Sequence, residues 1–122
     1  ILLTAAKTDG TIAWSQVYGG NKDDRFAGAT GFAGGIVAVG ASDSATSGDY
    51  DGWIVRLDGS GKLLWQKKLG GKFNDRFHAA ASLATGGVVV VGTTESPMAD
   101  QGPSQGNGWI VRINSAADSA CP

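Results

Sequence analysis

The apolar residues of this chain occur in short runs that are separated by glycine pairs and polar turns. Residues 52–57, "GWIVRL", alternate as a strand does, with Trp53, Val55 and Leu57 on one side and Ile54 and Arg56 on the other. The tetrapeptide "DGSG" (58–61) favours a tight turn into a second antiparallel strand, because glycine tolerates positive φ. Glycine and β-branched residues interrupt every run that is long enough for a helix, so the pattern predicts strands throughout.

The second half of the chain contains a run of a different kind. Residues 87–94, "GVVVVGTT", are continuously apolar and β-branched, which is typical of a strand that is buried on both faces. Three further segments complete a predicted unit of four short strands: "RFHAAASLA" (76–84), "GWIVRIN" (108–114) and "KLLWQKK" (62–68), the last from the junction between units.

The two halves of the sequence match each other at a nearly constant spacing. The first matches are 51 positions apart, and insertions in two loops widen the spacing further along. Matching of this kind indicates an internal repeat of about 50 residues. The matched residues are Trp14 with Trp65, Gly19-Gly20 with Gly70-Gly71, Asp24-Arg25-Phe26 with Asp75-Arg76-Phe77, Gly34-Gly35 with Gly86-Gly87, and 52–57 with 108–113.

Four-stranded units of this length with recurring glycine and tryptophan are typical of β-propeller blades. The unit resembles the bacterial β-propeller repeats of the SBBP kind through Trp53 to Asp58, Gly61, Trp65, Gly70-Gly71 and Asp75. That resemblance implies an all-β fold of four-stranded antiparallel meanders. It also implies a bacterial exported protein, located in the periplasm or outside the cell.

A second resemblance rests on two turns that lead into a tryptophan. "AKTDGTIAW" (6–14) and "LDGSGKLLW" (57–65) are similar to the tryptophan-docking repeat of pyrroloquinoline-quinone propellers. Both copies lack the threonine that this family carries before its glycine. This resemblance implies a quinone-linked enzyme or cofactor protein as an alternative.

The strand count predicts about two blades and part of a third, all within one propeller domain or part of one. Residues 1–20 match the outer strands of a preceding blade, 21–71 form a complete blade, 72–114 an incomplete blade, and 115–122 an irregular tail. Propellers close with four to eight blades, so these strands form an incomplete ring. We expect the remainder of a larger propeller or other protein chains to complete it; a homo-oligomer ranks second and a two-blade monomer last.

Composition narrows the possible functions. Glycine is abundant, at 20 of 122 residues, and the formal net charge is −1 with single, scattered Lys and Arg, so no basic stripe for nucleic acid is present. The longest apolar run is too short to span a membrane. The chain begins without Met, which predicts that it is processed or part of something longer, and Cys121 is the single cysteine.

Two kinds of repeated residue are candidates for function or for structure. Asp24-Arg25 and Asp75-Arg76 could contact a ligand near the central channel, but we favour a structural role in which Asp caps a turn and Arg pairs with a carboxylate. Tryptophans could stack on sugars or bases, but at fixed strand positions they are more typical of packing between blades. The four are Trp14, Trp53, Trp65 and Trp109.

Single residues and one loop offer further candidates. His78 is the only histidine and matches Ala27 in the first unit, so it is the position of the repeat to inspect for function. Without a second histidine, a His-rich metal site or a Cys/His pair within this chain is excluded, and no G-x-S-x-G motif supports a Ser-His-Asp triad. Asp49 and Asp51 lack the later carboxylate of a calcium loop, which favours a simple turn.

Loop residues that vary between the two units are candidates for partner binding, because specificity is often carried by variable loops on a constant scaffold. The longer of the two loops covers 94–107. The alternative is that its sequence differs only because a connecting loop tolerates substitutions and insertions. Its candidate residues are Pro97, Met98, Asp100, Gln101 and Pro103.

The sequence therefore predicts a non-enzymatic structural or binding subunit that contributes propeller blades to a larger assembly, without a catalytic residue, metal or cofactor on this chain. One alternative is part of a quinone-linked propeller enzyme whose chemistry lies on other blades. Another is a carbohydrate-binding propeller.

Overall fold

The computed structural model describes residues 1–43, 49–96 and 106–114, and all regular structure in these ranges is β-strand. The prediction of an all-β fold is therefore confirmed, and in the described ranges there is no helix that could cross a membrane. The strands are β1 (Leu2–Ala6), β2 (Ile12–Val17), β3 (Asp24–Phe32), β4 (Gly35–Ser42), β5 (Asp51–Leu57), β6 (Leu63–Leu69), β7 (Asp75–Ser82), β8 (Val88–Thr94) and β9 (Asn107–Ile113).

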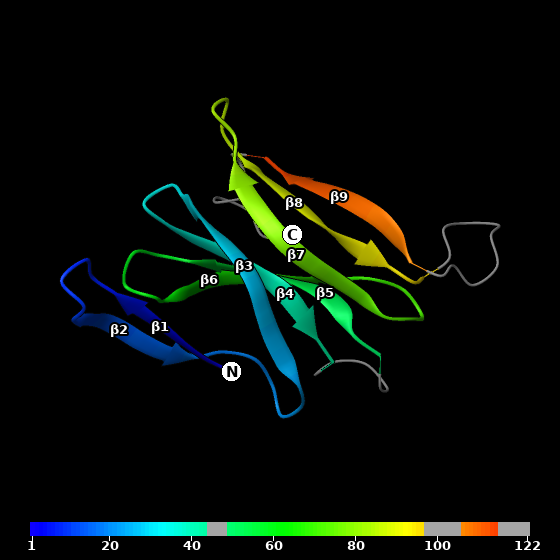
Figure 1. The fold of residues 1–122 in the computed structure, drawn as a ribbon, viewed down its shortest axis with the longest axis horizontal. Coiled ribbons are helices and arrows are strands. Elements are labelled where there is room, and N and C mark those ends of the chain that lie inside the picture. Colours follow the sequence, from blue (N-terminus) through cyan, green and yellow to red (C-terminus); the bar gives the residue numbers. More distant parts are fainter. Residues whose placement is uncertain (44–48, 97–105, 115–122) are drawn as a thin grey trace.

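The strands form three antiparallel sheets, in which neighbours in the sequence are neighbours in space (Figure 1). β1 and β2 form a two-stranded sheet, β3 to β6 a four-stranded sheet, and β7 to β9 a three-stranded sheet. The turn from β5 to β6 uses Gly61 at a φ of 85°. Its geometry is fixed by Asp58, whose Oδ1 accepts hydrogen bonds from the backbone N–H of Ser60 and of Lys62 at 2.8 and 3.0 Å.

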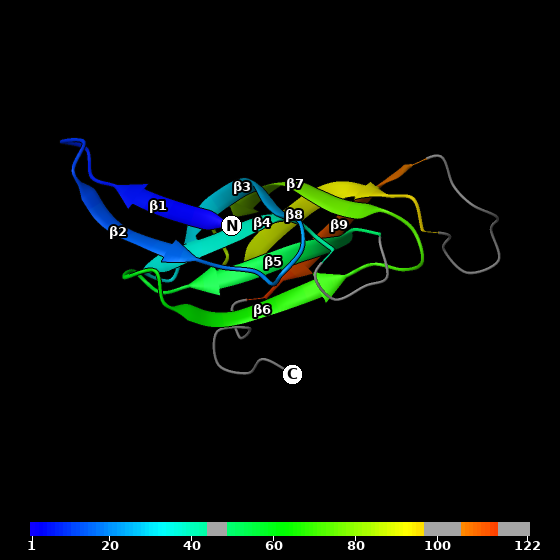
Figure 2. The ribbon, with the colours of Figure 1, turned by 90° about the horizontal axis from the view of Figure 1, so that it is seen from below.

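The four-stranded sheet lies in the middle of the stack and packs on both of its faces (Figure 2). Toward the three-stranded sheet it presents Val37, Val39 and Ile54, each at most 1% exposed. Their partners in this core come mainly from β7, β8 and β9 and include Phe77, Val88, Val90 and Ile113.

The opposite face of the four-stranded sheet packs on the two-stranded sheet. Trp53, Val55 and Leu57 are fully buried there, together with Tyr18, while Leu3 and Trp14 pack at the margin. The alternation read from "GWIVRL" is thus confirmed, because successive residues of β5 enter two different cores.

The outer face of the three-stranded sheet differs from the expectation for 87–94. β8 was predicted to be buried on both faces, but Val91 is 37% exposed, and Ile110 beside it on β9 is 74% exposed. The physical reason is that the described residues place a sheet against only one face of β7–β9.

Candidate functional site

The aspartates of the two Asp-Arg-Phe segments begin β3 and β7, and their side chains bind the turns that precede these strands. Asp24 accepts a hydrogen bond from the backbone N–H of Gly20 at 2.8 Å, and Asp75 accepts one from Gly71 at 2.8 Å. Each carboxylate also accepts a serine hydroxyl, from Ser42 on Asp24 and from Ser96 on Asp75. Both aspartates are buried, whereas the adjacent arginines are exposed, so the two members of each pair point to different environments.

A bulge interrupts β3 and β7 directly after the Asp-Arg-Phe segment. The register shifts between Phe26 and Gly28 in β3 and between Phe77 and Ala79 in β7, so His78 is the extra residue in β7. The facing glycine on β8, Gly92, has no room for a side chain, because an added Cβ would lie 1.9 Å from the carbonyl oxygen of Arg76. Bulges re-aim side chains and are frequent beside functional sites.

The arginines and the bulge residue of β7 meet at a hollow between the four-stranded and three-stranded sheets. We call it the Tyr50 hollow; it has a volume of about 190 Å³. Arg25, Arg76 and His78, which the sequence singled out separately, all line it. The described residues that line it are Arg25, Phe26, Ala27, Gly40, Ala41, Tyr50, Arg76, Phe77 and His78.

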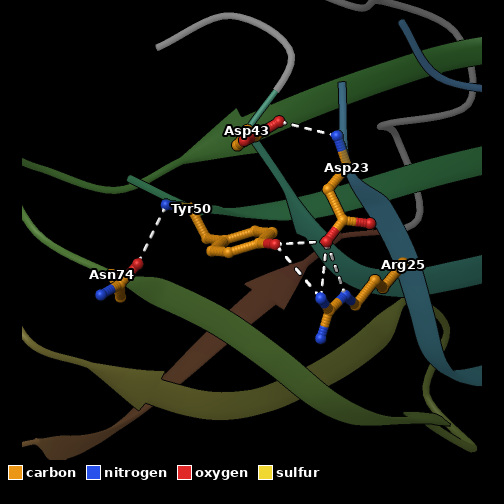
Figure 3. Close-up of polar contacts among 5 residues, drawn as sticks. All are labelled: Asp23, Arg25, Asp43, Tyr50 and Asn74. Carbon is orange, nitrogen blue, oxygen red and sulfur yellow. Dashed lines mark hydrogen bonds and ion pairs between the residues drawn. The ribbon is translucent and has the colours of Figure 1, made fainter. Parts of the chain in front are cut away.

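The backbone of Tyr50 is held on both sides by the segment that leads into β7. Its N–H donates to the side-chain Oδ1 of Asn74 at 3.2 Å, and its carbonyl accepts from the N–H of Asp75 at 2.7 Å. Tyr50 therefore belongs to the connection before β5 and is tied to the next sheet as well (Figure 3).

The side chain of Tyr50 lies near two guanidinium groups. The Cζ atoms of Arg25 and Arg76 are 5.4 and 5.6 Å from the centroid of its ring, which is within the range of cation–π attraction. Its hydroxyl donates to Oδ2 of Asp23 at 2.5 Å, the same oxygen that receives Nη2 of Arg25 at 2.5 Å (Figure 3). Asp43 adds an anchor by accepting the N–H of Asp23 at 2.9 Å.

These contacts shift the titration of two groups in the cluster. Hydrogen bonds from Arg25 and then Tyr50 hold the pKa of Asp23 below its usual value. The hydrogen bond to Asp23 is the main cause that raises the pKa of the Tyr50 phenol. Asp23 is thus ionised and Tyr50 protonated over the neutral range, which keeps this hydrogen bond in place.

His78 is exposed on β7, and its Nε2 lies 3.1 Å from Oγ1 of Thr93 on β8. His78 is also one of the residues that line the Tyr50 hollow. The sequence singled out His78 only because it is the one histidine, and the structure shows that it contacts Thr93 and lines the Tyr50 hollow.

The four tryptophans lie at sheet-to-sheet contacts. Trp53 and Trp65 belong to the two hydrophobic cores, and the indole of Trp14 lies so close to Gly61 that a Cβ there would be 2.6 Å from the ring. Trp109 packs beside the first core and donates its Nε1–H to the carbonyl of Arg76 at 3.2 Å. Stacking on a sugar requires an exposed aromatic face, and all four are at least partly buried.

Asp51 and Asp75 bring two carboxylates together above Gly70. One oxygen of each lies within 2.5 Å of the point that a Cβ at Gly70 would occupy. Burial, and then the charge of Asp75, raise the pKa of Asp51. In the described ranges, no group of three or more His, Cys, Asp or Glu residues is placed to hold a metal ion.

A larger hollow of about 360 Å³ lies between the two-stranded and four-stranded sheets. Lys62 is the charged residue in its lining, which otherwise consists of aromatic, aliphatic, glycine and amide groups, among them Tyr18, Trp53 and Gln66. We place the candidate site at the smaller Tyr50 hollow, because charged and hydrogen-bonding groups converge there.

Sequence reasoning missed Tyr50, which holds the site together. The available signal was its position two residues before Gly52, where the second unit has Gly106. The predicted partner-binding residues of the loop at 94–107, namely Pro97, Met98, Asp100, Gln101 and Pro103, lie outside the described residues, and so does Cys121.

Comparison of the sequence with protein-family models and with curated proteins gave no match. The assignment of function therefore depends on the geometry of the three sheets and of the Tyr50 hollow.

Proposed function

We propose that this chain is a non-enzymatic structural or binding segment of a β-propeller, which contributes its sheets to a larger assembly. The observation that carries the proposal is the exposed apolar outer face of the three-stranded sheet. Ile110 is 74% exposed, whereas Ile54, which the sequence comparison matches to it, is 1% exposed because the three-stranded sheet covers it.

Other positions of the same face show the same contrast. Val91 is 37% exposed and its match Val39 is fully buried. An added Cβ at Gly52 would collide with Phe77, but one at the matching Gly108 would meet nothing within 4 Å. The outer face of β7–β9 thus carries the features of a face that binds a sheet, and no sheet of the described residues lies on it.

The other end of the stack is also apolar. Leu2, Ile12 and Val17 of the two-stranded sheet are 64%, 66% and 76% exposed. Burying a side chain of this size is worth about 1.5–3 kcal/mol, so covering either end would be strongly favourable. We infer that further propeller sheets, from a longer polypeptide or from partner chains, cover these two ends. The resemblance to SBBP-like repeats adds to this proposal that the protein is bacterial and exported.

The test is the association state of the 122-residue chain, measured by sedimentation velocity over a range of concentrations. We expect concentration-dependent association that Ile110→Lys abolishes. Leu64→Lys is the matched control, because Leu64 is exposed and apolar but lies on the edge strand β6. A monodisperse species of 12.4 kDa at every concentration would contradict the proposal, and so would equal effects of the two substitutions.

A further inference from the structure

We propose that the Tyr50 hollow binds a carboxylate group and that Arg76 is its principal contact. The inference stands apart from the propeller assembly, because every residue that it uses lies in the four-stranded sheet, in the three-stranded sheet or in the connections that lead into their strands.

The two arginines of the hollow differ in what neutralises them. Arg25 forms an ion pair with Asp23 at 2.5 Å. The residue that matches Asp23 in the second unit is Asn74, which carries no charge. Within the described residues, Arg76 makes no ion pair or hydrogen bond with its guanidinium group, and its contact is the ring of Tyr50. The positive charge of Arg76 is therefore available to a ligand.

The walls of the hollow suit an anion with an apolar body. Among the described residues that line it, none is Asp or Glu, so no carboxylate competes from the walls. Phe26 is a partly buried apolar residue of the lining, Phe77 is a fully buried one, and His78 stands in the lining where the first unit has Ala27. The second unit thus has an amide where the first has an acid, and an imidazole where the first has a methyl group.

The hollow has room for a carboxylate, and its charge favours a carboxylate over phosphate. A volume of about 190 Å³ admits a small acid or one acidic side chain. A guanidinium group presents two parallel N–H donors that match the two oxygens of a carboxylate. One uncompensated arginine balances one negative charge, whereas phosphate near neutral pH carries more than one.

The hollow is held in shape before a ligand arrives. Tyr50 is fixed through its backbone by Asn74 and Asp75, and its hydroxyl is fixed by Asp23. Its ring in turn supports the guanidinium of Arg76 from one side. Prior ordering of this kind lowers the entropic cost of binding.

The carboxylate could belong to a free small acid or to an acidic side chain of a bound polypeptide. Titrations of the wild-type chain followed by NMR distinguish the two sources, with the resonances of His78 and Tyr50 as reporters. The probes are benzoate and the peptide acetyl-Gly-Glu-Gly-amide, each compared with its neutral counterpart, benzamide or acetyl-Gly-Gln-Gly-amide. Inorganic phosphate is the competing anion.

We expect at least one of the two acids to shift these resonances in a saturable manner, while its amide does not. Arg76→Gln should weaken that binding roughly tenfold, since the two parallel hydrogen bonds from the guanidinium group to the carboxylate are lost. Arg112→Gln is the matched control, because Arg112 is an exposed arginine on β9 and does not line the hollow.

Binding of benzoate alone assigns a free acid, and binding of the peptide alone assigns a partner side chain; either supports the proposal. Equal shifts with acid and amide, equal losses in Arg76→Gln and Arg112→Gln, stronger binding of phosphate than of both acids, or no binding of either acid would overturn it. If Arg76→Gln does not fold, the comparison of acid with amide on the wild-type chain decides.

Discussion

The ring of Phe77 stacks on the indole of Trp109, with centroids 4.8 Å apart and planes 9° from parallel. Phe26 and Trp53 stack at the same distance and angle in the four-stranded sheet. The pair in the three-stranded sheet fits against Gly52, where an added Cβ would lie 2.7 Å from Phe77 and 2.9 Å from Trp109. The missing side chain at Gly52 therefore allows the two sheets to approach.

Gly52→Ala is expected to destabilise the fold by about 1–3 kcal/mol, because the aromatic pair must move away from β5. The matched control is Gly108→Ala, where a Cβ meets nothing within 4 Å. We expect the control to be neutral or slightly stabilising. Urea unfolding of dilute protein measures both, and equal losses in the two variants would contradict the packing described for Gly52.

Arg56 is buried in β5, while Arg112, its match in β9, is exposed. The guanidinium of Arg56 donates to the carbonyls of Leu57 and Ala33 and lies 5.1 Å from the centroid of the Phe32 ring. Arg56→Ala leaves those carbonyls without a charged donor and removes a buried stem. We expect a loss of about 2–4 kcal/mol, compared with at most about 0.5 kcal/mol for Arg112→Ala. The midpoints of thermal unfolding compare the two.

Tyr50→Phe removes the hydroxyl that donates to Asp23 and keeps the ring that contacts both arginines. We expect only a small loss of stability, because this hydrogen bond is exposed to solvent. The pKa of Asp23 should rise but remain below 3.8, because the stronger contribution from Arg25 persists. A carboxyl ¹³C titration measures this, and an unchanged pKa would show that the hydroxyl does not bind Asp23 in solution.

Asp51 makes the free energy of unfolding depend on pH in the acidic range. Its raised pKa means that the folded chain holds this proton more tightly than the unfolded chain does, so its contribution to stability is lost as the pH rises from 3.8 through the raised value. Asp51→Asn should therefore stabilise the protein at neutral pH and flatten that part of the profile.

Asp9 provides the opposite case for the same experiment. Hydrogen bonds from Thr11 lower the pKa of Asp9, so its contribution is present above 3.8 and is lost as the pH falls. Asp9→Asn should remove this contribution at neutral pH and have no effect in acid. Denaturant unfolding at a series of pH values separates the two carboxylates, and slopes of the same sign would contradict the assignment.

Local pattern was enough to predict much of the fold. The alternation of β5 placed Trp53 and Ile54 on opposite faces, and the structure puts them in separate cores. This works because the side-chain period of a strand is fixed by its backbone. The exposure of Val91 was not predictable in the same way, since burial depends on what lies over a sheet and not on the strand itself.

The candidate site was predictable only in pieces. Arg76 and His78 were recognised as repeated and unique positions, but nothing local indicates that they share a hollow with Arg25. Their meeting depends on how β3 packs beside β7, about 50 residues further along the chain. Tyr50 was missed because its role comes from contacts with Asp23 and Asn74, both remote in sequence.

The three sheets differ in the number of strands and contacts that stabilise them. Only two strands, β1 and β2, make up the first sheet, which is joined to the next by one apolar cluster and by the hydroxyl of Tyr18 on the carbonyl of Gly61. A pair of strands is barely stable alone, so this hairpin should detach and return in brief excursions while β4 and β5 stay closed. Amide protons of β1 and β2 should then exchange with deuterium well before those of the central strands. Local stability is therefore lowest at the two-stranded end of the fold and higher in the four-stranded sheet.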